Sequence, residues 1–99
     1  MSIEQFAEIT RKVIARDGFD GFLPTLCLPV RRHIAVLEGA PTDSGADMRS
    51  IALKWVSEKI SSDEEYLIAI KESSESFLII RHVGLKTEEK LYSLNEAKT

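Results

Sequence analysis

Two apolar segments separated by a short polar block constrain this chain more than any other feature. Residues 66–70 read YLIAI, residues 77–83 read FLIIRHV, and residues 72–75 between them read ESSE. Isoleucine, valine and aromatic side chains fit the pleated surface of a sheet. Two such segments around a four-residue polar loop predict an antiparallel hairpin.

The predicted hairpin is apolar on both of its faces. A loop at residues 72–75 pairs Ile70 with Phe77 and thereby sets the register. One face then carries Tyr66, Ile68, Ile70, Phe77 and Ile79. The other face carries Leu67, Ala69, Leu78 and Ile80. A sheet with one face in water alternates apolar and polar residues, so we expect each of the two faces to be covered.

The flanking sequence predicts two helices and three further strands. Ser2 and Gln5 have the spacing of a capping box, and apolar residues at helical spacing follow, which predicts a helix over 3–16. Prolines bracket residues 25–28, so a strand there is expected to be short and at an edge. Residues 32–38 predict another strand, and residues 91–94 begin a last strand of open register. A second helix is predicted around Trp55, whose place on the apolar stripe of that helix predicts a core residue packed on the hairpin.

These elements follow the order α-β-β-α-β-β-β within one predicted domain, residues 1–99. The order predicts an α+β fold with a mainly antiparallel sheet and two helices packed on one of its faces. It is similar to the order of elements in Roadblock-type and profilin-like domains, although the sequence motifs of those families are absent.

Composition narrows the class of protein. The formal net charge of −3 disfavours nucleic-acid and anionic-membrane binding, since both need a basic surface. No apolar segment approaches the roughly 20 residues that span a bilayer. Cys27 is the single cysteine, which leaves no internal disulfide, and we expect a cytoplasmic protein.

No convergent set of catalytic or metal-binding residues is found, so we expect no catalytic residue, no metal and no cofactor. His33 and His82 are the two histidines, and their spacing from Cys27 and from each other matches no standard ligand pattern. Cys27 and His33 are a conceivable nucleophile and base, but the apolar neighbours of Cys27 favour an inert, buried thiol.

A cationic cluster is the most suggestive polar feature. If the strand from Arg32 and the strand from Phe77 are neighbours, they bring together five residues that can hold a carboxylate or phosphate. These candidate ligand-binding residues are Arg31, Arg32, His33, Arg81 and His82. The alternative is that they are strand-end charges that keep sheet edges soluble.

Two functional hypotheses follow. The first is a non-enzymatic interaction or regulatory module, a homodimer or the binder of another protein, because two helices on one face leave the second apolar face to a partner. The alternative is a monomer in which the sheet curls strongly and the loop from Gly18 to Phe22 folds over that face. The expected interface residues are Tyr66, Ile68, Ile70, Phe77 and Ile79. The second is a small-ligand-binding protein or minor enzyme that uses the Arg/His cluster.

Overall fold

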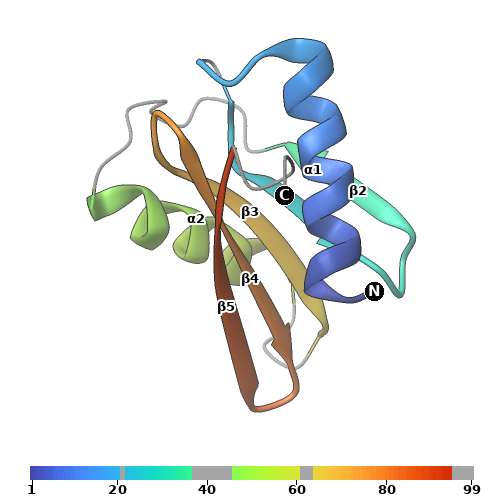
Figure 1. Cartoon of the computed structure of the whole chain (residues 1–99). Coiled ribbons are helices and arrows are strands. Elements are labelled where there is room, and N and C mark those ends of the chain that lie inside the picture. The colour runs from blue at the N-terminus through green and yellow to red at the C-terminus, as the bar shows by residue number, and fades with distance from the viewer. Residues whose placement is uncertain (21, 37–45, 61–63, 95–99) are drawn as a thin grey trace.

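The order of elements predicted from the sequence is confirmed. A computed structural model describes residues 1–20, 22–36, 46–60 and 64–94, and these residues form two helices and five strands in an α+β arrangement (Figure 1). The elements are α1 (Ile3–Asp17), β1 (Thr25–Leu28), β2 (His33–Val36), α2 (Ala46–Lys59), β3 (Tyr66–Ser73), β4 (Ser76–Val83) and β5 (Lys86–Ser93).

The five strands form one antiparallel sheet in the order β2-β1-β3-β4-β5. The expectation that residues 25–28 form an edge strand is wrong, because β1 pairs with both β2 and β3. Pro24 and Pro29 lie just outside the four paired residues, so neither removes an N–H group from the ladder.

Helix α1 begins and ends where local chemistry predicts. The Ser2 N–H donates to Oε1 of Gln5 at 2.8 Å, and the Gln5 N–H donates to Oγ of Ser2 at 3.2 Å, which completes the capping box. Gly18 follows the last turn with φ of 87°, a backbone conformation that glycine adopts without a Cβ clash. The helix therefore needs no tertiary contact to set its two ends.

The two helices pack on opposite faces of the sheet, which corrects the prediction that they share one face (Figure 1). Helix α1 covers an apolar cluster, the α1 face, made of Ile3, Phe6, Ala7, Phe19, Phe22, Cys27, Leu67, Ala69, Phe77, Ile79 and Tyr92. Helix α2 covers the α2 face, made of Leu26, Leu28, Ala52, Val56, Ile68, Ile70 and Ile80. Neighbouring residues of a strand point to opposite faces, so β1 and β3 contribute alternate residues to the two clusters.

The β3–β4 hairpin has a register one residue away from the predicted one. Lys71 pairs with Phe77 and Ile70 with Leu78, and the register shifts between Lys71 and Ser73 before a tight turn. An extra residue on one strand of a pair is a β-bulge. Beyond a bulge, the side chains of one strand share a face with a different set of residues on the other strand than they would in a continuous ladder. The predicted interface set is therefore divided, with Phe77 and Ile79 on the α1 face and Tyr66, Ile68 and Ile70 on the α2 side.

Both faces of the hairpin are covered by the chain itself. Leu67, Ile68, Phe77 and Ile79 are each completely buried, and Phe19 and Phe22, from the segment after α1, fill the α1 face. The expectation that both faces need cover is confirmed. The inference that a partner must supply that cover is wrong, because α1 and α2 each take one face.

Candidate functional site

The two edges of the sheet differ in chemistry. Strand β5 presents charged and exposed side chains at Lys86, Glu88, Glu89 and Lys90. On β2, Ile34 and Val36 are about half exposed, at 50% and 47%, and β2 pairs only with β1 among the described strands. Charged side chains protect an edge from pairing with another chain, whereas short apolar ones leave it open. The β2 edge is therefore the open edge of the described sheet.

An apolar groove runs between α1 and the β1–β2 side of the sheet. It consists of three adjoining hollows of about 480, 60 and 200 Å³ along α1, which we call the α1–β2 groove. Ile34 lines the first two hollows, and Val13, Phe22 and Thr25 line the last two. Side chains from α1 form one wall, and β1 and β2 form the floor, because α1 contacts β3 and β4 and leaves this side of the sheet open.

The widest hollow opens beside the turn that joins β1 to β2. Arg32 and His33 line it together with Met1, Gln5, Cys27, Pro29 and Ile34. The Arg31 N–H donates to the carbonyl of Leu28 at 3.1 Å, and the Arg32 N–H donates to that of Pro29 at 3.2 Å. Arg32 takes a φ of 52°, a left-handed conformation that costs a residue with a Cβ about 1–2 kcal/mol.

The five predicted ligand-binding residues do not form one cluster. Strands β1 and β3 separate β2 from β4, which places the two strands about 14 Å apart at three spacings of about 4.8 Å. Carboxylates also neutralise two of the arginines. Arg31 lies 2.7 Å from Oε1 of Glu64, and Arg81 lies 3.1 Å from Oε2 of Glu65 and 3.8 Å from Oε2 of Glu88. The condition for a shared cluster, that these two strands are neighbours, is therefore not met.

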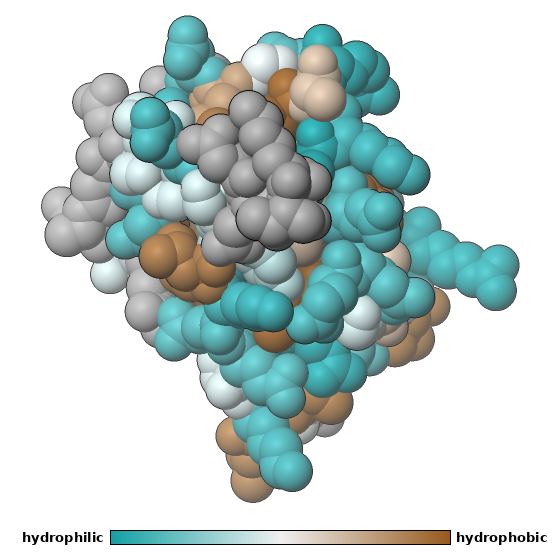
Figure 2. Space-filling model, viewed as in Figure 1, coloured by the Kyte–Doolittle hydropathy of each residue, from teal (hydrophilic) through white to brown (hydrophobic). Residues whose placement is uncertain are grey.

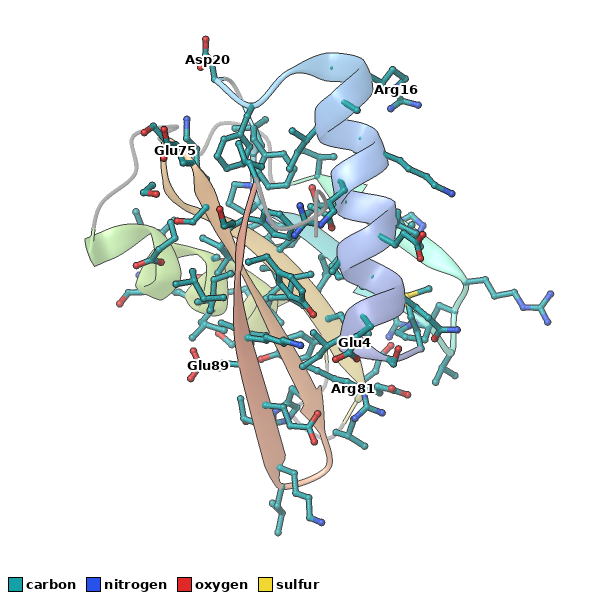
Figure 3. The ribbon with its side chains drawn as sticks, viewed as in Figure 1. Glu4, Arg16, Asp20, Glu75, Arg81 and Glu89 are labelled. Atoms are coloured by element: carbon teal, nitrogen blue, oxygen red, sulfur yellow. The ribbon has the colours of Figure 1, made fainter. Side chains whose placement is uncertain are left out.

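Arg81 instead ties β4 to the start of α1. Its Nε donates to the Met1 carbonyl at 3.1 Å, and Figure 3 shows it at the end of α1 where Glu4 lies. His82 belongs to the other side of the sheet, where its ring stacks on Tyr66 with 5.1 Å between centroids and its Nδ1 lies 3.2 Å from Oγ1 of Thr87. Both residues thus have structural contacts, which leaves Arg32 as the arginine of the groove.

Cys27 and His33 are not arranged as a nucleophile and a base. Cys27 pairs with Ile34 and Leu28 pairs with His33, so Cys27 and His33 lie on opposite faces of the β1–β2 ladder. Cys27 as a residue is 3% exposed, and its Sγ lies 3.9 Å from Sδ of Met1. Burial raises the pKa of the Cys27 thiol, which lowers the fraction of reactive thiolate at neutral pH.

We expect Cys27 to react slowly with a thiol reagent in the native protein and rapidly in denaturant. The raised pKa also means that the unfolded chain ionises first, so stability attributed to this thiol is present below pH ~9 and falls as pH rises above it. Labelling followed by mass spectrometry checks the first statement, and urea unfolding of wild type and Cys27→Ala from pH 8 to 10 checks the second. Fast native labelling at pH 7 would contradict the buried, neutral thiol.

The described residues contain no group of three His, Cys, Asp or Glu side chains that could hold a metal ion. None of the described helices has the length and apolar composition needed to cross a membrane.

Comparison with protein-family models, with curated proteins and with solved structures finds no match to this chain.

The groove residues Ile9, Val13, Phe22, Ile34 and Val36 were not predicted as a site. The apolar residues at 34 and 36 indicate a strand, but an exposed edge strand and a buried one share that pattern. Only the strand order shows that these two side chains lie at an edge.

Proposed function

We propose that this chain is a non-enzymatic interaction module of the cytoplasm that associates with a second copy of itself through β2. The observation that carries the proposal is the exposed apolar pair Ile34 and Val36 on an edge strand without charged protection. The opposite edge, β5, is charged and exposed, so the sheet offers one edge for strand addition.

A two-fold axis perpendicular to the sheet would pair β2 with β2 of the other copy in antiparallel fashion. Closed two-fold pairing is the commonest form of self-association, and it continues the hydrogen-bonded ladder across the interface. This axis keeps each face of the sheet on its own side, so Ile34 and Val36 of both copies would lie together. It also separates the two Arg32–His33 turns, which reduces repulsion between them.

The size of the β2 edge supports weak association. The strand has four residues, His33–Val36, and stable interfaces bury about 1,200–2,000 Å² in total. A ladder of this length falls at the low end of that range even with the neighbouring side chains included. We therefore expect a monomer–dimer equilibrium at micromolar concentration, or about −8 kcal/mol of association free energy.

Ile34→Lys is expected to abolish self-association. A lysine on an edge strand places a charge where the second strand would pack, which is how natural sheets protect their edges. Sedimentation equilibrium at micromolar concentration should give a concentration-dependent mass above 11.1 kDa for the wild type and 11.1 kDa for the variant.

Leu91→Lys is the matched control, because Leu91 is 54% exposed on the opposite edge strand. It should sediment like the wild type. A wild-type mass of 11.1 kDa at every concentration would overturn the proposal. Equal dissociation by Leu91→Lys and Ile34→Lys would move the interface away from β2.

A further inference from the structure

We propose that the α1–β2 groove binds a small anionic amphiphile, with its oxyanion head at Arg32 and its apolar tail along α1. The chemical class is a carboxylate or phosphate monoester joined to an unbranched apolar chain. The groove lies over β1 and β2 on the α1 face, so it shares the Ile34 and Val36 side chains with the proposed self-association but does not use the backbone edge of β2.

The shape of the groove fits a head and a tail. Its first hollow is wide, about 480 Å³, and contains the polar residues Gln5, Arg32 and His33. Its middle hollow narrows to about 60 Å³ between Ile9, Val13 and Phe22. Ligand sites are commonly cavities of roughly 300–1,000 Å³ lined by apolar side chains with a few polar groups. This groove has its polar side chains in the wide hollow and apolar side chains along the narrow one.

The polar residues of the narrow part are already satisfied within the chain. Oγ1 of Thr10 donates to the Phe6 carbonyl at 2.8 Å, and Oγ1 of Thr25 donates to the Leu23 carbonyl at 3.1 Å. Asp17, at the far end, lies 3.0 Å from Arg16. The middle of the groove therefore demands no hydrogen bonds from its occupant, which favours a hydrocarbon over a polar ligand or a peptide backbone.

Arg32 is the group that selects an anion. It makes no ion pair with any described residue, whereas Arg31 and Arg81 are both neutralised by glutamates. Its guanidinium carries a planar set of donors that matches carboxylate and phosphate oxygens. The chain also holds it in a left-handed backbone conformation that asparagine or glycine adopts at lower cost. Strain retained at the mouth of a cavity is typical of positions with a functional role.

The test is a calorimetric titration of the full chain with decanoate, decyl phosphate and the neutral alcohol 1-decanol. We expect saturable binding of at least one of the two anions and at least tenfold weaker binding of the alcohol, because the alcohol cannot pair with Arg32. The arm that binds more tightly identifies the head group. Among carboxylates from hexanoate to decanoate, each added methylene should tighten binding about fourfold while it still enters the groove.

Two variants separate the head from the tail. Arg32→Asn removes the charge but suits the left-handed backbone, so it should weaken anion binding at least tenfold without lowering the melting temperature. Val13→Asp puts a carboxylate in the narrow part and should weaken binding by at least as much. Arg16→Asn, at the exposed far end of α1, removes the same charge and should leave binding unchanged (Figure 3).

Three results would overturn the inference: no saturable binding of either anion, affinity independent of chain length, or unchanged affinity in Arg32→Asn. The chain-length series needs no variant, so the test remains valid even where Val13→Asp does not fold. Sedimentation of the same samples tests self-association separately from ligand binding. If the dimer forms but no amphiphile binds, the amphiphile proposal is rejected and the self-association proposal is retained.

Discussion

Phe77→Ala is expected to lower the free energy of unfolding by about 3–5 kcal/mol, as aromatic truncations in well-packed cores do. Phe77 is completely buried on the α1 face, and its ring stacks on Tyr92 with 5.4 Å between centroids. The guanidinium carbon of Arg11 lies 5.4 Å from the Phe77 ring centre, so the substitution also removes a cation–π contact. Urea unfolding followed by circular dichroism measures the loss.

Trp55→Ala is the comparison for this prediction. The sequence indicates Trp55 as a core residue of the second helix, but the structure leaves it only partly buried at the margin of the α2 face. Its truncation should therefore cost less, about 2 kcal/mol, since the loss follows the buried apolar area. A larger loss for Trp55→Ala than for Phe77→Ala would contradict this assignment of the core.

Ile68→Ala is expected to lower the free energy of unfolding by about 2–5 kcal/mol. Its effect should depend on substitutions in α2 and not on substitutions in α1. Ile68 is completely buried and belongs to the cluster that contains Val56 of α2. In a double-mutant cycle, Ile68→Ala and Val56→Ala should deviate from additivity by about 0.5–3 kcal/mol. Ile68→Ala and Phe6→Ala should add within about 0.5 kcal/mol, because the sheet lies between the two sites.

Leu67 provides the matched control for the cycle, since it is the preceding residue of β3 and lies on the α1 face. Leu67→Ala should show the reverse pattern, coupling with Phe6→Ala and adding with Val56→Ala. Coupling of Ile68 with Phe6 as strong as its coupling with Val56 would mean that the helices do not lie on opposite faces.

The register of the β3–β4 hairpin divides the residues of the predicted dimer interface between the two faces of the sheet. The sequence indicates apolar residues at every position from 66 to 70, and this pattern is the same in either register. The bulge between Lys71 and Ser73 decides the register, because it changes which residues of β3 and β4 share a face. The proposed interface therefore moves from the face of the hairpin to the edge strand β2.

Local chemistry in the sequence determined the elements and their ends. The Ser2–Gln5 capping box, the Gly18 stop and the apolar segments of β3 and β4 all act within a few residues, and the structure places a helix or a strand at each. The continuous apolar character of these two strands also indicated that both faces of the sheet are covered. Ion pairs between residues that are far apart in the sequence, such as Arg31 with Glu64, cannot be predicted from patterns that span only a few residues.

Tertiary structure alone decided the strand order, the opposite placement of the helices and the groove. All three features depend on which apolar surfaces of the chain pack against each other. The hydrophobic effect is non-directional, so the apolar periodicity of a segment does not identify the segment that it packs against. Arg32 shows the consequence: its sequence neighbours suggest a shared cluster with Arg81, but the insertion of β1 and β3 between their strands separates them. The same insertion leaves β2 at an edge, with Ile34 and Val36 exposed beside the α1–β2 groove. Figure 2 shows hydrophilic and hydrophobic residues interspersed over the surface of the protein in this view.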